Sequence, residues 1–301
     1  MTERISPRID IAFKKIFGVE ENKDLLISLI NSIVSKEDQV SEVTLLNPYN
    51  PQSFKKDKLS ILDIKAKGAS GKRFNIEIQI TDEADYDKRA LYYWAKLYTE
   101  QLKVAQDYST LAKAIGIHIL NFTSIPQTTN YHNSFRITER NQGFVYFEDL
   151  ELHTIELNKF SSNANEELCD IVAKVKTSLD MWSAFLTRND LLKADSLPEE
   201  LNDANLKKAI TVLEVMNFSV EERDFYEDHL KWLRIETNTL KKMKEEGIAE
   251  GRAEGLAEGE AKGKAEITRR MLLKGKNIEE IMDITDLSVE EIKEIAAKIK
   301  S

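Results

Sequence analysis

A strict alternation of side chains at residues 74–80 places the strongest constraint on how this chain folds. The even-numbered positions are phenylalanine or isoleucine, and the odd-numbered positions are Asn75, Glu77 and Gln79. Such a period of two predicts a strand with one apolar and one polar face. A second short alternating run covers Leu59–Ala66, and a glycine-bearing segment from Lys67 to Arg73 separates the two runs. Together they predict an antiparallel β-hairpin.

Two carboxylates face one another if the turn of this hairpin is centred on Ser70. Asp63 and Glu77 would then lie directly opposite, with Cβ atoms about 4.5–5.5 Å apart. Carboxylates at that distance repel unless a cation lies between them or one of them is protonated. Mg²⁺ suits carboxylate and water ligands, and such a metal activates water and stabilises charge on a phosphate. The alternative, which the spacing leaves open, is the polar, solvent-facing side of a two-stranded ribbon.

The rest of the chain predicts an α/β domain followed by helices. Helical spacing of apolar residues occurs at 9–17, 22–34 and 85–106, and strand-like runs occur at 40–46, 114–122, 135–137, 143–147 and 153–157. From residue 165 to residue 244 the apolar period is helical almost throughout. We therefore expect four parts: an α/β domain at 1–158, a helical appendage at 159–244, a repeat segment at 245–266 and a small helical interaction module at 267–301.

The repeat segment carries a glycine and an alanine in every four residues, from Gly247 to Ala265. On a helix, each series would form a slowly winding stripe of small side chains. Five glycines cost roughly 4–5 kcal/mol relative to alanines in a helix interior. The segment is therefore either a polar linker that frays or a helix that a partner helix stabilises. We expect residues 245–301 to mediate self-association as a dimer.

The C-terminal module has two cap-like helix starts, at Asn277 and Ser288. This layout resembles a helix-turn-helix, but the last helix opens with Glu290 and Glu291, which would repel phosphates in a DNA groove. We therefore favour a protein-interaction module over a DNA reader.

Composition excludes several classes of protein. The one cysteine, Cys169, rules out an intramolecular disulfide framework and a Cys-rich zinc site. The four histidines are scattered, and His118 lies in an apolar run typical of a core or edge strand. No apolar run approaches the roughly 18 residues of a membrane span, and the N-terminal segment has no signal-peptide core. We expect a cytoplasmic protein with no membrane partner.

Although the net charge is −9, the segment from Phe54 to Arg73 is locally basic, with seven lysine or arginine residues against Asp57 and Asp63. A local excess of positive charge suits a polyanionic partner. Ordinary surface lysines on a solvated hairpin explain the same pattern.

Several segments together resemble the Rpn family of recombination-promoting nucleases, also described as putative transposases of the PD-(D/E)XK superfamily. The segments that carry the resemblance are Asp10–Gly18, Leu25–Asn31, Leu59–Ala66, Phe74–Gln79 and Lys88–Tyr98. The glycine-spaced tract before a short helical end is also similar to this family, so the likeness covers nearly the whole chain.

The resemblance implies a restriction-endonuclease-like core, with a mixed central sheet flanked by helices and an all-helical C-terminal region after it. It implies a DNA endonuclease that uses Mg²⁺ or Mn²⁺ held by Asp63 and Glu77, with a link to recombination, mobile elements or defence. Gln79 stands where the superfamily's E-x-K motif has lysine, so Lys65 or Lys14 would have to supply the missing positive charge. That departure keeps an alternative open, a catalytically weak or inactive scaffold with a binding or regulatory role. No DDE-type triad is evident, so we do not predict transposition chemistry.

Three further residues are candidates for the site. Asp10 is either an additional acidic group or, slightly favoured, the N-cap of the first helix. Arg89 and Tyr93 lie four residues apart on one helix face. They would contact a phosphate or brace the metal-bearing face, and packing with an ordinary surface charge explains them equally well.

Overall fold

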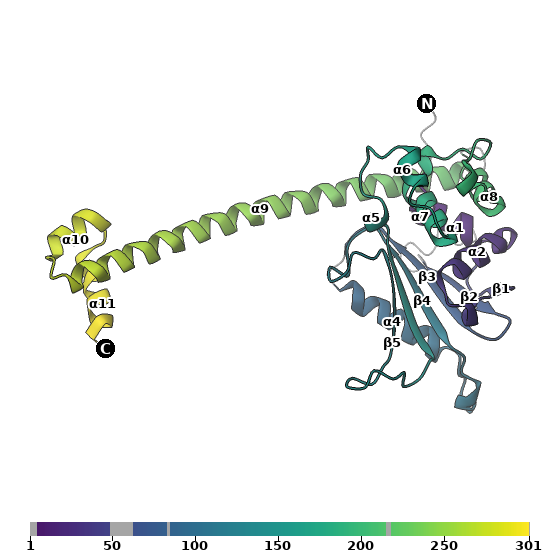
Figure 1. Ribbon diagram of the computed structural model, residues 1–301, viewed down its shortest axis with the longest axis horizontal. Helices are drawn as coiled ribbons and strands as arrows, with labels where there is room; N and C mark the ends of the chain where they lie inside the picture. The colour runs from purple at the N-terminus through teal and green to yellow at the C-terminus, as the bar shows by residue number, and fades with distance from the viewer. Residues whose placement is uncertain (1–4, 49–62, 83–84, 215–217, 301) are drawn as a thin grey trace. The chain divides into compact units, whose positions relative to one another are not determined.

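The computed structural model describes residues 5–48, 63–82, 85–214 and 218–300, and the chain divides into one compact unit up to Lys231 and another from Trp232. Within these residues the first unit contains a six-stranded mixed sheet of order β1-β2-β3-β4-β6-β5 (Figure 1). Strands β3, β4 and β6 run parallel, and the remaining neighbours pair antiparallel. The strands are β1 (Val43–Leu45), β2 (Ile64–Gly68), β3 (Arg73–Gln79), β4 (Ala114–Leu120), β5 (His132–Arg136) and β6 (Leu150–Glu156).

The hairpin of β2 and β3 has the predicted register, because Ile64 pairs with Ile76. Asp63 lies one residue before β2, and the side chain of Asn47 extends the strand pairing to it. Asn47 Nδ2 donates to the Asp63 carbonyl (3.0 Å), and the Lys65 backbone N–H donates to Asn47 Oδ1 (2.7 Å). Residues 59–62 of the predicted strand lie outside the described residues.

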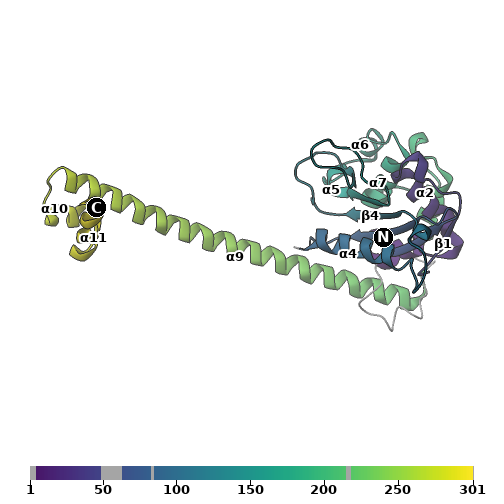
Figure 2. The same ribbon diagram turned by 90° about the horizontal axis from the view of Figure 1, so that it is seen from below.

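Strand β3 lies between β2 and β4, and from Phe74 to Gln79 every residue is buried. Helix α4 (Tyr86–Thr99) covers the face that carries Glu77 and Gln79, and Figure 2 shows this helix along one side of the sheet. The polar, solvent-facing ribbon that the spacing left open is therefore wrong. Alternation showed which side chains share a face, but not that a helix covers the polar one.

Helices from both ends of the first unit share one apolar core. The fully buried Trp182 of α7 (Ser178–Arg188) lies 5.3 Å from the Phe17 ring and 5.9 Å from the Phe185 ring, measured between centroids. Its indole N–H donates to the Ser28 hydroxyl of α2 (Lys23–Ile33).

The boundaries expected at residues 158, 244 and 266 stay predictions. The other helices of this unit are α1 (Asp10–Phe17), α2 (Lys23–Ile33), α5 (Leu157–Phe160), α6 (Leu168–Val172), α7 (Ser178–Arg188) and α8 (Ala204–Val212).

Three predicted elements are markedly shorter than expected, and the first is β1, which covers only Val43–Leu45 of the run at 40–46. Helix α4 ends at Thr99 rather than Gln106, and Ala105 beyond it has a left-handed φ of 69°. Among the described residues, the strand expected at 143–147 is reduced to one bridge between Thr138 and Val145. Phe144 and Tyr146 in this segment are exposed, so no apolar face stabilises a longer strand.

A polar chain joins β5 to β6 away from the hairpin. His132 Nε2 lies 3.0 Å from His153 Nδ1, and His153 Nε2 lies 2.7 Å from Glu151 Oε1. Burial, reinforced by His153, lowers the pKa of His132 to about 4. The ring is therefore neutral at pH 7, and protonating it in the folded state costs free energy.

We expect the wild type to lose more stability than His132→Gln when the pH falls from about 7 to about 4. An unfolded histidine takes up its proton near pH 6.5, whereas folded His132 resists protonation until about pH 4. The unfolded state therefore binds more protons in this window, and acid favours unfolding. Urea titrations of both proteins at pH 7 and pH 4.5 measure the difference, and an equal loss in both would contradict the pKa of His132.

Helix α9 (Val220–Leu273) begins in the first unit and continues into the second. Its start has the predicted capping box, since Ser219 and Glu222 exchange hydrogen bonds of 2.8 and 3.2 Å between side chain and backbone. The repeat segment at 245–266 is helical throughout, and apart from the neighbouring backbone of the helix itself no described atom lies within 4 Å of where a Cβ would stand on Gly247 or Gly263. The segment is thus an exposed helix among the residues described.

The second unit ends with α10 (Ile278–Thr285) and α11 (Val289–Lys300), which bury Ile281 and Ile292. The predicted caps are present: Asn277 Oδ1 accepts from the Glu280 N–H, and Ser288 exchanges bonds with Glu291. None of the helices in the described part of the chain combines the length and hydrophobicity needed to cross a bilayer.

Candidate functional site

The two predicted carboxylates lie on the adjacent strands β2 and β3. The observed register, continued by one residue, places Asp63 opposite Glu77. Burial raises the pKa of Asp63, and the nearby positive charges of Lys65 and Lys14 oppose this rise. Glu77 is 3% exposed. Glu77 is therefore held where water solvates it poorly, whereas Asp63 is half-buried, so a compensating positive charge has its largest effect at Glu77.

Helix α1 contributes Asp10 and Lys14, both buried and one turn apart. Burial raises the pKa of Asp10 to about 7; Lys14 opposes the rise, and Glu77 adds to it. Burial lowers the pKa of Lys14 to about 8, against the attraction of Asp63 and Asp10. Helix α1 packs against β2, because a Cβ at its C-cap Gly18 would lie 3.5 Å from the Ile64 side chain, next to Asp63.

The N-cap interpretation of Asp10 is wrong. Helix α1 begins at Asp10, the cap position belongs to Ile9, and no side chain caps the helix. The Asp10 carboxylate is buried, with Oδ2 3.8 Å from His229 Nε2. A buried first-turn carboxylate near Glu77 is compatible with the other prediction, an additional acidic group.

Helix α4 brings Arg89 onto the polar face of β3. Its Nη2 donates to Gln79 Oε1 at 2.8 Å and to Glu77 Oε1 at 3.1 Å, and its guanidinium lies 5.1 Å from the Tyr86 ring centroid. The Gln79 amide nitrogen donates to the Thr81 carbonyl (3.1 Å), which turns Oε1 toward Arg89. A cation thus contacts the side chain that stands in the lysine position of E-x-K.

Of the other sequence candidates, Lys65 lies on the strand face of Asp63, with Nζ 3.5 Å from Glu100 Oε2. For Tyr93, the contact that the structure shows within its described part is with the neighbouring Tyr92 ring, at 5.8 Å. The structure therefore brings together Asp63, Glu77, Gln79, Asp10, Lys14, Lys65 and Arg89, but it does not bring Tyr93 to the carboxylates.

The sequence did not indicate that His118 lies beside Glu77. This residue pairs with Glu77 across β3 and β4, and its Nδ1 lies 2.9 Å from the Tyr86 hydroxyl and 3.8 Å from Glu77 Oε2. Burial, with Arg89 and His153 adding to it, lowers the pKa of His118 to about 4, so the ring is neutral. No local pattern signals a parallel pairing between residues this far apart in the chain.

The donor groups fit a hard divalent cation that keeps water ligands. Among the residues described, no three His, Cys, Asp or Glu side chains lie close enough together to hold a metal ion. Asp63 and Glu77 would thus supply two ligands, and water would complete the coordination, as Mg²⁺ commonly allows. Asn75, on the same strand face, has a buried amide without a hydrogen-bond partner in the described part of the chain.

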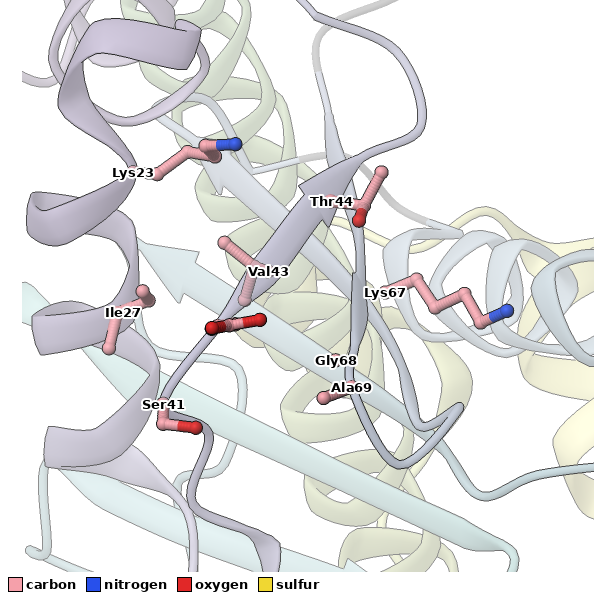
Figure 3. A pocket seen from close by; sticks show the side chains of 9 residues that line it. Lys23, Ile27, Ser41, Val43, Thr44, Lys67, Gly68 and Ala69 are labelled. Carbon is pink, nitrogen blue, oxygen red and sulfur yellow. The ribbon is translucent and has the colours of Figure 1, made fainter.

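A pocket of about 460 Å³ lies elsewhere, between α2, β1 and the turn of the hairpin. Lys23, Ile27, Val43 and Gly68 are among its lining residues, and Figure 3 shows Lys67 pointing away from Lys23. Gly68 is at the turn end of β2, whereas Asp63 precedes the other end. The pocket is therefore separate from the carboxylates.

The first unit is thus an α/β protein whose mixed sheet is flanked by helices and carries paired carboxylates on neighbouring strands, with cations around them. The family model described as PD-(D/E)XK nuclease family transposase matches residues 7–243. The chain belongs to this family, which confirms the resemblance and the predicted fold class. Comparison with curated proteins and with solved structures finds no match.

Proposed function

We propose that this protein is a metal-dependent DNA endonuclease that hydrolyses phosphodiester bonds and serves DNA recombination or mobile-element biology. Family membership supports a nuclease- or transposase-like role in general terms. The observation that carries the finer proposal is the opposed placement of the half-buried Asp63 and the buried Glu77, with Lys14 near Asp63 and Arg89 on Glu77.

In this proposal Asp63 and Glu77 hold Mg²⁺ or Mn²⁺. When bound, such an ion stabilises negative charge on a phosphate and makes water a better nucleophile at neutral pH. Lys14 and Lys65 supply positive charge beside Asp63, where Gln79 supplies none. A buried ammonium such as that of Lys14 interacts more strongly with a phosphate than an exposed one does.

The test is cleavage of supercoiled and linear DNA by the purified full-length protein with Mg²⁺, with Mn²⁺ or with EDTA. We expect cleavage with either metal, none with EDTA, and a rate at least roughly 100-fold lower from Asp63→Asn with either metal. Metal-dependent cleavage by Asp63→Asn at the wild-type rate would refute the assigned site.

A second candidate function is a nuclease-like scaffold that binds DNA without cutting it. Glutamine at position 79 and the burial of Glu77 favour this alternative, because neither helps a substrate phosphate reach a metal. Tight DNA binding in a mobility-shift assay, with no cleavage under any metal condition, would favour the scaffold over the enzyme.

We also propose that residues 245–301 mediate self-association as a dimer. Helix α9 exposes Ile248 (52%), Leu256 (66%) and Ile267 (46%) beside its glycine positions. Glycines permit close approach of a second helix, and burying the apolar side chains would offset the low helix propensity of the glycines. Two copies would bring two nuclease domains to one DNA molecule.

Truncation after Lys244 is expected to convert a dimer into a folded monomer with weaker double-strand cleavage. The first unit should remain folded, because the contacts that join α9 to it lie before the cut. These contacts are the ion pair of Glu222 with Lys15 and the hydrogen bond from the Ser6 N–H to the Tyr226 hydroxyl. Light scattering at micromolar concentration measures the molar mass of the full-length and the truncated protein. A full-length monomer, or a truncated protein that is still dimeric, would contradict the proposal.

A further inference from the structure

Within the described part of the chain, Arg89 is a positively charged side chain in direct contact with the proposed metal ligand Glu77. Its Nη2 bridges Glu77 Oε1 at 3.1 Å and Gln79 Oε1 at 2.8 Å, and the Glu77 side chain is only 4% exposed. A carboxylate buried to this extent needs a cation or several hydrogen bonds to remain stable. In the arrangement that the structure shows, Arg89 provides that charge.

We infer that Arg89 is a built-in counter-cation, which neutralises Glu77 when no metal is bound and which a divalent metal ion replaces. The inference rests on the proposed function, since it takes Glu77 as a metal ligand. A guanidinium and a metal ion compete for the same carboxylate, and like charges brought together on it repel. Metal binding therefore weakens or breaks the contact of Arg89 with Glu77. The free energy of that contact lowers the net affinity of the site for the metal ion.

If Arg89 loses its contact with Glu77, it keeps its hydrogen bond to the side chain of Gln79. Its amide nitrogen is directed to Thr81, and its neutral Oε1 accepts the shorter of the two bonds from Arg89. The Tyr86 ring, 5.1 Å from the guanidinium carbon, supports the same position through a cation–π contact. Arg89 is therefore a positioning residue that stays beside the metal site, and a lysine at position 79 would repel it.

The test compares Mn²⁺ binding to the wild type, Arg89→Gln, Arg89→Lys and Glu77→Gln, by calorimetry and by the electron paramagnetic resonance signal of free Mn²⁺ at pH 8. We expect Arg89→Gln to bind Mn²⁺ about tenfold more tightly than the wild type, which corresponds to about 1.4 kcal/mol. Arg89→Lys keeps the charge and should stay within about threefold of the wild type. Thermal melts should show Arg89→Gln less stable than the wild type in EDTA, with the deficit reduced by saturating Mn²⁺.

The outcomes separate this inference from the proposed function. Mn²⁺ binding that is equal in the wild type and Glu77→Gln would remove the metal site, and with it the proposed function. Mn²⁺ binding that Glu77→Gln abolishes but Arg89→Gln weakens or leaves unchanged would overturn the counter-cation inference alone, because Arg89 would then only brace Glu77. Equal tightening in Arg89→Gln and Arg89→Lys would also overturn it, because the charge would not be the cause.

Discussion

DNA cleavage is expected to fall by at least roughly 100-fold in Asp63→Asn and in Glu77→Gln, the size of loss typical when a group that stabilises developing charge is removed. Both substitutions keep the shape of the side chain and remove an anionic ligand. The two carboxylates oppose one another by strand register, so neither can replace the other. Cleavage rates with saturating DNA and Mg²⁺ measure the effect.

The same two variants should differ in stability, which separates lost chemistry from lost structure. Burial raises the pKa of Asp63, so its ionised form reduces stability at pH 8, and Asp63→Asn should melt at or above the wild-type temperature in EDTA. Glu77→Gln removes the charge that pairs with Arg89 and should cost about 1–3 kcal/mol.

Asp87→Asn is the matched control, because Asp87 is an exposed carboxylate on α4. Its cleavage rate and melting temperature should equal those of the wild type. Wild-type cleavage by Asp63→Asn and Glu77→Gln would exclude the paired carboxylates as the site, whatever the stability of the variants.

Trp182→Ala is expected to destabilise the first unit by about 3–5 kcal/mol, the usual cost of truncating a large buried aromatic side chain. Trp182 is fully buried against the Phe17 and Phe185 rings, and its N–H bonds to Ser28. The substitution leaves a large apolar cavity between α1, α2 and α7, and Ser28 loses its partner. Because these helices come from both ends of the unit, the loss should spread to the sheet.

Urea unfolding followed by circular dichroism and by tryptophan fluorescence measures this effect. Trp232→Ala provides the matched control, since Trp232 is 52% exposed and lies beyond the first unit. It should change the stability of the first unit by less than about 0.5 kcal/mol. A loss below about 1 kcal/mol in Trp182→Ala would show that the helices after residue 158 do not share a core with the N-terminal helices.

The sequence by itself determined the local features of this protein. Alternation and one glycine-bearing turn predicted the register that pairs Ile64 with Ile76, because the period of a strand and the length of a turn leave little freedom. The helix starts at Ser219, Asn277 and Ser288 were likewise predictable, because a cap and its partner are only three residues apart.

Only the tertiary structure decided what surrounds the carboxylates. The contacts of Glu77 with Arg89 and with His118 depend on how α4 and β4 pack against the hairpin. The closeness of Asp10 and Lys14 to the carboxylates depends on how α1 packs there. The same packing buried the polar face of β3 and shifted the pKa values of Asp10 and Lys14. It also placed the Tyr93 ring against the Tyr92 ring and not against the carboxylates. These contacts join residues far apart in the chain, and their energies depend on burial, which no local spacing encodes.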